Sequence, residues 1–280
     1  MTRHLKTLMT STLIAFGLTA CNYGESSVDK TAASPVESLS KAELAAVVEE
    51  AAQKGSEVNA SYNVFLAKYV TQKDGINLVA YEDVSEADER ALEAYIETLS
   101  NTDISTYSAA EQQAYWYNLY NAQTVDLILD NMPLESIRQI SRPWDQKLLT
   151  VNGQKMSLND VEHETLRKQF DEPRVHFAVN CASIGCPNLK MTAWEADTLD
   201  ADLTKSAQDY VRSPRGITID AEGKVDASEI FKWYRDDFGS NEKELLSYLS
   251  QFAEGSTKST LQSASKVDDW DYDWSLNIAK

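Results

Sequence analysis

Residues 108–131 limit the folds open to this chain, because they predict a long helix whose apolar face carries two asparagines. Ser108 and Glu111 have the spacing of a capping box, in which each side chain accepts a hydrogen bond from an otherwise free backbone N–H. Steps of three and four residues along the helix then place six side chains in one stripe: Ala114, Tyr117, Asn118, Asn121, Val125 and Ile128. The fold must therefore provide partners for two amides inside an apolar face.

Asn118 and Asn121 can meet that requirement in two ways. A buried carboxamide that is left unpaired costs about 1–3 kcal/mol, so each of them needs partners in the fold. One alternative is that they hold the backbone of a neighbouring loop. The other is that one of them serves a catalytic site, by orienting an imidazole or by donating to an oxyanion.

Three more helices are predicted, over residues 41–53, 85–100 and 157–170. The second carries Leu92, Tyr95, Ile96 and Leu99 at helical spacing. The third begins at Ser157, whose hydroxyl can cap it, with Asp160 at the capping-box position.

Glu162 and His163 are the candidate site residues on the third of these helices. Its apolar positions leave Glu162 close to the buried stripe and His163 at the flank. A carboxylate is seldom buried alone, so Glu162 is expected to face a cation, a histidine or a group of N–H donors, with Arg174 the nearest candidate. The alternative is a half-exposed glutamate at the edge of the stripe.

The segment RVHFAVN (residues 174–180) predicts a buried strand, because it has strand length and is rich in β-branched and aromatic residues. Alternation along a strand puts His176 on one face and Cys181 on the other. A contact between the Cys181 thiol and an imidazole would then need a chain bend at Asn180 or the more distant His163.

Cys181 and Cys186 admit four interpretations. They can form a disulfide, which suits an exported protein in an oxidising compartment. One of them can be a catalytic thiolate with a histidine as its base. Both can be small buried side chains. They can also join His163 and Glu162 in a zinc site, although the Cys-x4-Cys spacing matches no strong zinc signature.

The first 21 residues indicate export and lipid attachment. Residues 1–20 run from a basic start through a short apolar stretch to small residues, as a secretory signal peptide does. The sequence Leu-Thr-Ala-Cys that ends at Cys21 resembles a bacterial lipobox, so Cys21 is expected to carry lipid and to attach the protein to a membrane. Asn22 is compatible with delivery to the outer membrane, facing the periplasm.

The remaining chain predicts one domain behind a tether. Residues 21–40 are rich in Ser, Ala and Glu without apolar periodicity, as in a flexible linker. Residues 41–280 show no second linker and no internal repeat, so we expect a single α+β domain, rich in helix with a small sheet. The acidic segment 268–274 contains aromatic residues, which predicts that it docks on that domain.

Charge and motifs exclude several functions. The formal net charge of −18 argues against binding to nucleic acid, which depends on Lys and Arg neutralising phosphates. Dinucleotide-binding, P-loop, zinc-protease and nucleophile-elbow motifs do not occur in the sequence. We therefore predict neither a cofactor nor a resident metal.

Several motifs together resemble the domain-of-unknown-function family 547 (DUF547). They are YWYNLYNA (115–122), SLNDVEHETLR (157–167), RVHFAVNCASIGCPNL (174–189), KWYRDDFG (232–239) and YDWSLN (272–277), and the resemblance spans roughly residues 60–278. It implies motif positions at Asn118, Asn121, Glu162, His163, Arg174, His176, Cys181 and Cys186. It also implies a distant similarity to papain-like or transglutaminase-like thiol enzymes, although papain-like chains place Cys before His and Asn.

The leading hypothesis is a cysteine-dependent hydrolase or acyl/amide transferase. Cys181 is its nucleophile, His163 its first-choice base with His176 as the other histidine, and Asn118 or Asn121 an orienting or oxyanion group. The alternative is a non-enzymatic envelope domain that binds a small molecule, a peptide or a protein and is stapled by a Cys181–Cys186 disulfide.

Overall fold

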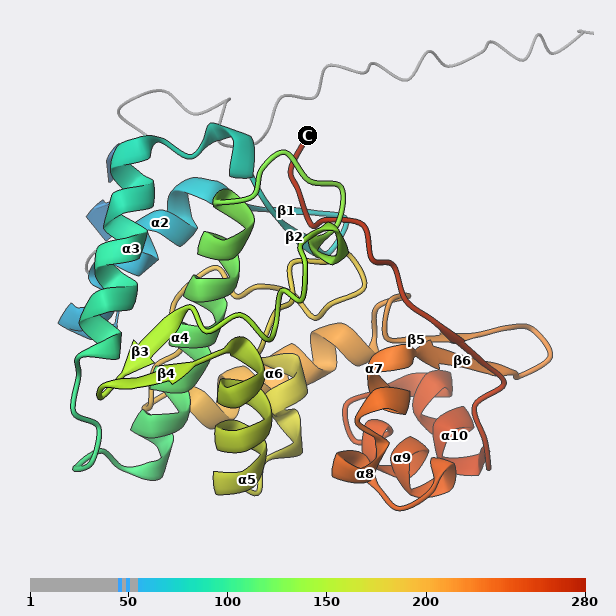
Figure 1. Cartoon of the computed structure of the whole chain (residues 1–280). Coiled ribbons are helices and arrows are strands. Elements are labelled where there is room, and N and C mark those ends of the chain that lie inside the picture. Colours follow the sequence, from blue (N-terminus) through green and yellow to red (C-terminus); the bar gives the residue numbers. More distant parts are fainter. Residues whose placement is uncertain (1–44, 47–48, 51–54) are drawn as a thin grey trace, which may run out of the picture. The chain divides into compact units, whose positions relative to one another are not determined.

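The computed structural model describes residues 45–46, 49–50 and 55–280, all of which belong to one compact unit (Figure 1). The predicted signal peptide, Cys21 and the tether lie outside the described residues. The predicted helix over residues 41–53 lies mostly outside them too, and its four described residues are helical. None of the described helices has the length and apolar content needed to cross a membrane.

Helices dominate the described chain, and short strands lie between them. The α-helices are α2 (Ala60–Tyr69), α3 (Glu86–Ser100), α4 (Ala109–Leu129), α5 (Arg167–Gln169), α6 (Leu199–Val211), α7 (Glu229–Trp233), α8 (Arg235–Phe238), α9 (Glu242–Leu249) and α10 (Gly255–Ser263). The 3₁₀ turns are η1 (Glu57–Asn59), η2 (Tyr81–Asp83), η3 (Ile137–Gln139) and η5 (Pro173–Phe177), and η4 (Asp160–Leu166) is a π-helix.

The strands form three small sheets within the described residues. They are β1 (Val70–Lys73) with β2 (Ile76–Val79), β3 (Leu149–Val151) with β4 (Gln154–Met156), and β5 (Ile217–Ile219), β6 (Val225–Ser228) and β7 (Asp269–Asp271). The first two sheets are antiparallel hairpins with register Val70↔Val79 and Leu149↔Met156. The predicted helix-rich α+β domain is confirmed.

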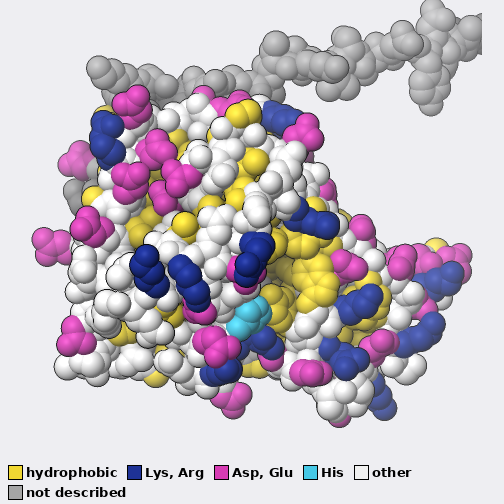
Figure 2. All heavy atoms as spheres, in the orientation of Figure 1, with side chains coloured by type: hydrophobic (Ala, Val, Ile, Leu, Met, Phe, Trp, Pro, Cys, Tyr) yellow, Lys and Arg dark blue, Asp and Glu magenta, His cyan; other side chains and the backbone are white. Residues whose placement is uncertain are grey.

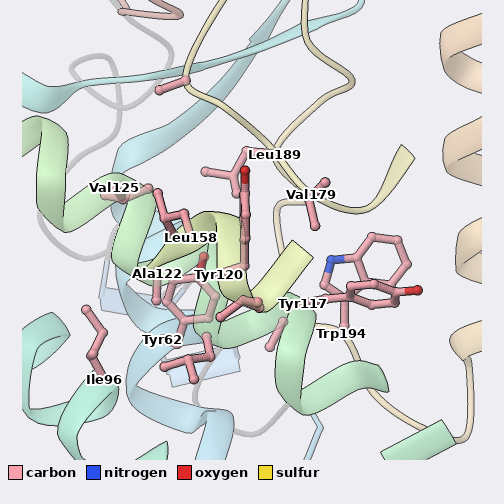
Figure 3. Close-up of a cluster of buried hydrophobic side chains, with 14 of the residues drawn as sticks. Tyr62, Ile96, Tyr117, Tyr120, Ala122, Val125, Leu158, Val179, Leu189 and Trp194 are labelled. Atoms are coloured by element: carbon pink, nitrogen blue, oxygen red, sulfur yellow. The ribbon is translucent and has the colours of Figure 1, made fainter. Parts of the chain in front are cut away.

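Helix α4 runs through the larger of two hydrophobic clusters (Figure 3). Its predicted capping box is confirmed: the Ser108 N–H donates to Glu111 Oε2 over 2.7 Å, and the Glu111 N–H donates to Ser108 Oγ over 3.3 Å. The predicted stripe is buried, but so are most other side chains from Ala114 to Ile128. A helix that is buried on nearly all sides lies inside the core rather than on its surface.

The second hydrophobic cluster is built by the C-terminal third of the chain. It joins residues of α6–α10 and of the β5–β6–β7 sheet, in which β6 pairs antiparallel with β5 and parallel with β7. The predicted docking of residues 268–274 is thus confirmed, with Asp226 opposite Asp269 in the β6–β7 register. Beyond β7 the chain returns to the first hairpin, where Ile278 bridges to Val79.

The predicted strand over residues 174–180 is wrong, because residues 174–177 belong to the 3₁₀ turn η5 and residues 178–180 are in no strand. Pro173 fits the first helical position, where its fixed φ and missing N–H suit the turn. Glu172 caps the turn by accepting the Arg174 N–H over 3.0 Å. The β-branched residues of this segment favour a strand, but the helical start at Glu172 and Pro173 determines the local structure.

The helix predicted over residues 157–170 is present, but its central part differs from an ordinary α-helix. The Ser157 N–H donates to Asp160 Oδ2 over 2.6 Å and the Asp160 N–H to Ser157 Oγ over 3.2 Å, which confirms the predicted cap. Residues 160–166 are wound as the π-helix η4, which carries Glu162. Such wider turns often occur at functional sites.

Phe177 links η5 to the second cluster and provides a test of that packing. Its ring is fully buried, with centroid distances of 6.0–6.1 Å to Tyr210, Phe231, Phe238 and Phe252. We expect Phe177→Ala to lower the free energy of unfolding by about 3–5 kcal/mol, measured by denaturant unfolding. Met191→Ala, at a side chain that is 41% exposed, is the control and should change it by no more than about 0.5 kcal/mol. Equal effects of the two substitutions would contradict the packing described.

Candidate active site

A cavity of ≈ 220 Å³ brings four chemically active side chains together. They are Glu162 from η4, His176 from η5, and Cys181 and Cys186 from the loop that follows. Six aromatic side chains share its lining: Tyr120, Trp144, Trp233, Tyr234, Tyr272 and Trp274. We call it the aromatic cavity. Trp233 is 44% exposed, and Figure 2 shows hydrophobic side chains gathered on the surface near α7.

The loop that holds the two cysteines (residues 180–187, the cysteine loop) is closed by the side chain of Asn180. Asn180 Nδ2 donates to the Pro187 carbonyl over 2.7 Å, and Asn180 Oδ1 accepts the Ala182 N–H over 2.9 Å. Ala182 has a φ of +57°, which turns the chain directly after Cys181. The two ends of the loop are thereby held together, with Cys181 near its start and Cys186 near its end.

Cys181 is surrounded by hydrogen-bond donors. Its Sγ lies 2.7 Å from Cys186 Sγ, 3.0 Å from the Tyr272 hydroxyl and 3.2 Å from Ser183 Oγ. Gly185 allows the approach of Tyr272, because a Cβ at that position would lie 2.9 Å from the tyrosine ring. Tyr272 comes from the docked C-terminal segment, so this segment completes the surroundings of the thiol.

The two cysteine thiols differ in acidity. The hydrogen bond from Cys186, together with those from Ser183 and Tyr272, holds the pKa of Cys181 below its usual range, although burial opposes them. Burial raises the pKa of Cys186 well above its usual range. Cys181 is partly exposed whereas Cys186 is buried, so Cys181 is both the more acidic and the more accessible of the two thiols.

His176 is held between two carboxylates. Its Nε2 lies 2.6 Å from Asp237 Oδ2, and its Nδ1 lies 3.9 Å from Glu162 Oε1. Arg167 binds the same Asp237 with two bonds, of 2.6 and 2.8 Å. Burial raises the pKa of Asp237, but the hydrogen bonds from His176 and Arg167 outweigh it and hold this pKa well below its usual range. Asp237 is therefore ionised, and Nε2 donates its proton to it.

Glu162 is 5% exposed and has the partner that its burial requires. The Tyr120 hydroxyl donates to Glu162 Oε2 over 3.1 Å, and the His176 ring faces its other oxygen. The prediction that Arg174 is the neighbour of Glu162 is wrong, because Arg174 binds Glu172 over 2.6 Å and Asp200 over 2.8 Å. Of the partners predicted for Glu162, the histidine is the one present.

His163 lies apart from the cysteines. Its Nδ1 is 3.0 Å from Arg167, its ring is tilted against Tyr234, and it does not belong to the lining of the aromatic cavity. The geometry thus favours His176 over His163, which reverses the preference drawn from the predicted strand. Among the described residues, the hydrogen-bond contacts of Cys181 are with Cys186, Ser183 and Tyr272, and neither histidine is one of them.

The two asparagines of α4 both bind loop backbone. Asn118 donates to the Trp194 carbonyl over 2.9 Å and accepts the Trp194 N–H over 2.8 Å. Asn121 does the same with the Ala178 carbonyl, over 2.9 Å, and the Asn180 N–H, over 2.8 Å. Both ends of each amide are occupied, so Asn121 positions the start of the cysteine loop and Asn118 fixes a different segment.

The zinc alternative finds no support in the described part of the chain. No group of three or more His, Cys, Asp or Glu side chains there has an arrangement that could hold a metal ion. His163, one of the proposed ligands, is directed to Arg167 instead of the cysteines.

Sequence reasoning did not name Tyr120, Asp237, Tyr272 and Ser183 as site residues. Asp237 and Tyr272 do fall within the motifs KWYRDDFG and YDWSLN, which were singled out without a role. Their roles depend on contacts across 61 and 91 residues of sequence, to His176 and Cys181. The spacing of residues within a short segment does not predict contacts between residues so far apart in the sequence.

Comparison with known proteins supports one family assignment. Residues 104–211 match the family described as "Protein of unknown function, DUF547", so the match to this domain holds for that stretch of the chain. The match contains α4, η4, η5, the cysteine loop and α6, while Asp237 and Tyr272 lie beyond it. No curated protein and no solved structure matches the chain, and the distant papain-like similarity stays a prediction.

The hydrogen bond from Tyr272 to Cys181 predicts a change in thiol reactivity. Tyr272→Phe removes a donor to the thiolate, so the pKa of Cys181 should rise and its alkylation by iodoacetamide at pH 7 should slow by about tenfold. The measurement is the labelling rate against pH, with the site assigned by fragment masses. Tyr107→Phe, outside the aromatic cavity, is the control. Unchanged labelling in Tyr272→Phe would contradict the assignment.

Asp237 should couple the stability of this site to pH. Because its pKa is lowered in the folded protein, ionised Asp237 stabilises the fold above about pH 4, its unfolded pKa, and this contribution is lost as the pH falls further. We expect Asp237→Asn to lower the free energy of unfolding by about 1–3 kcal/mol at pH 7, with the difference from the unsubstituted protein shrinking below pH 4. The exposed neighbour Asp236 supplies the control, Asp236→Asn. A difference that is independent of pH would contradict this account.

Proposed function

We propose that this protein is a cysteine-dependent hydrolase or acyl/amide transferase with Cys181 as its nucleophile. The observation that carries the proposal is the Cys181 thiol itself, whose pKa is lowered and which lies on an aromatic cavity together with His176 and Glu162. A lowered thiol pKa at a partly exposed position is characteristic of nucleophilic cysteines.

The reaction begins with an acyl group in the aromatic cavity. The Cys181 thiolate adds to the acyl carbonyl, and the bond between the acyl carbon and its leaving group breaks. The leaving group takes up the proton that the thiol released on ionising, and a thioester remains on the sulfur. The hydroxyls of Tyr272 and Ser183 lie 3.0 and 3.2 Å from the sulfur and are the donors next to the developing oxyanion. Water or an amine then attacks the thioester, which gives hydrolysis or transfer.

His176 is the proposed acid–base group. It shares the cavity with Cys181, and Asp237 fixes its orientation and tautomer through Nε2. Its Nδ1 is left facing Glu162, so these two groups can take a proton from the attacking water and return it. Asn121 acts as a positioning residue, because its amide holds the backbone at Ala178 and Asn180.

The location proposed for this activity is the cell envelope of a bacterium. Support comes from the sequence of residues 1–21, with its signal-peptide pattern and the lipid-accepting Cys21. A lipid on Cys21 would hold the domain at a membrane, and the outer membrane facing the periplasm is the proposed site. The substrate would be a small molecule or peptide of that compartment.

The competing proposal is a binding domain whose cysteines form a structural disulfide. It is favoured by the aromatic lining and by the nearness of the two sulfur atoms, neither of which requires catalysis. The two proposals differ in one property: the enzyme forms a covalent acyl intermediate on Cys181, and the binding domain does not.

The test uses the purified protein, kept reduced, and an activated aryl ester of phenylacetic acid as the probe. We expect an acyl group on Cys181, found by mass spectrometry after acid quench, and turnover of the ester. His176→Gln should retain the acyl group but lower kcat by about 100-fold, since general acid–base catalysis contributes about 10²–10⁴. His163→Gln, outside the cavity, is the matched control and should leave kcat nearly unchanged. Absence of acyl-Cys181 in the unsubstituted protein would favour the binding domain.

A further inference from the structure

Cys186 forms no bond in the proposed acyl transfer, although its hydrogen bond helps to lower the pKa of Cys181. Among the described hydrogen-bond partners of the Cys181 sulfur, it is the nearest. The two sulfur atoms are 2.7 Å apart, and the Cys181 N–H points to Cys186 Sγ over 3.0 Å. Cys186 is 3% exposed, so its contacts are with protein groups, the Cys181 sulfur among them. Packing alone does not explain why a second thiol is held next to the Cys181 sulfur.

The cysteine loop keeps the two sulfurs adjacent by contacts that do not involve sulfur. Asn180 closes the loop, and Arg215 donates to the carbonyls of Ile184 and Cys186 over 3.1 and 2.6 Å. The Tyr210 hydroxyl binds the Gly185 carbonyl over 2.7 Å. Because these bonds are independent of the redox state of the cysteines, the loop can keep its shape with two thiols or with a disulfide.

The two thiols also differ in access. Both cysteines line the aromatic cavity, but Cys181 is partly exposed there and Cys186 is buried, so a reagent that enters the cavity has readier access to Cys181. The lowered pKa of Cys181 and the raised pKa of Cys186 agree with this order. An exposed acidic thiol with a second cysteine beside it is the arrangement of a redox-active pair.

We propose that Cys181 and Cys186 form a reversible dithiol–disulfide couple, in which a hydroperoxide oxidises Cys181 at the aromatic cavity and Cys186 resolves the product. This rests on the reactive Cys181 of the proposed function, and it adds a redox chemistry that acyl transfer does not need. While the disulfide is closed, Cys181 cannot act as a nucleophile, so the couple also protects the thiol from irreversible oxidation.

The reaction balances in two steps. The Cys181 thiolate attacks one oxygen of the hydroperoxide ROOH; the S–O bond forms, the O–O bond breaks, and RO⁻ leaves and takes a proton to give ROH. Sulfur loses two electrons and becomes a sulfenic acid. The Cys186 sulfur then attacks it; the S–S bond forms, the S–O bond breaks, and hydroxide leaves as water with the Cys186 proton. A dithiol reductant, by two thiol–disulfide exchanges, returns both thiols.

The sequence offers a convenient readout of this couple. Cleavage after Arg174 and Lys190 gives one peptide, VHFAVNCASIGCPNLK, that contains both cysteines and excludes Cys21. A disulfide within it lowers its mass by two hydrogens and blocks alkylation at both sites. A sulfenic acid on Cys181 is trapped by the 1,3-dione dimedone and located by fragment masses.

The experiment treats the reduced, purified protein with one equivalent of hydrogen peroxide or of cumene hydroperoxide. We expect both cysteines to become a disulfide that dithiothreitol reopens in the folded protein. Cys186→Ser should stop at a dimedone-reactive sulfenic acid on Cys181, and Cys181→Ser should form neither product in this peptide. Faster reaction with cumene hydroperoxide would assign an organic hydroperoxide as oxidant, and equal or faster reaction with hydrogen peroxide would assign hydrogen peroxide.

Two results would overturn the couple. One is oxidation of Cys181 to the sulfinic acid in the unsubstituted protein while Cys186 stays a free thiol. The other is a disulfide that opens only after unfolding, which would make it a structural staple. The acyl-enzyme assay on reduced Cys186→Ser separates the two proposals: an acyl group on Cys181 there shows that acyl transfer holds even when the couple fails. Absence of acyl-Cys181 in the reduced, unsubstituted protein, with reversible disulfide formation intact, leaves the couple and removes acyl transfer.

Discussion

The side chain of Asn121 is the contact on which the arrangement of this site depends. It lies in the middle of α4, 2% exposed, and binds the backbone on both sides of Val179. The segment from η5 to the cysteine loop has no strand partner here, so this amide supplies the hydrogen bonds that a sheet would otherwise give. His176 precedes the bound backbone and Cys181 follows it, and one core helix thus positions both.

Charged side chains surround His176 inside the site. Asp237, ionised and bound by Arg167, accepts from one nitrogen of the ring, and Glu162 lies beyond the other. The Tyr234 ring stacks on His176 with a centroid distance of 3.9 Å, which restricts its rotation. A buried imidazole fixed in this way keeps one orientation, as an acid–base group or a structural hub requires. The π-helix η4 is the element that carries Glu162 to it.

The sequence predicted much of the helical framework and less of the site. The α4 cap, the apolar stripe of α3 and the Ser157 cap follow from local side-chain spacing, and the structure has them. The strand over residues 174–180 was mispredicted because β-branched composition was weighed above Pro173, which starts a helical turn. The strand prediction was the reason for preferring His163 as the base, since strand alternation separates His176 from Cys181. Asp237 and Tyr272 depend on long-range contacts that spacing cannot predict.

The C-terminal segment contributes two side chains to the site, so the site is complete only when this segment is docked. Tyr272 and Trp274 follow β7, which is held by three residue pairs with β6, and they bring a hydroxyl to Cys181 and an aromatic ring to the cavity. The Leu276 and Ile184 N–H groups bind the Glu135 and Ser275 carbonyls over 2.8 Å, which ties the same segment to the first half of the domain and to the cysteine loop. A chain with this segment detached would keep both cysteines but lose a donor that lowers the pKa of Cys181. Docking of the last residues therefore contributes to the acidity of the Cys181 thiol, beside the hydrogen bonds from Cys186 and Ser183.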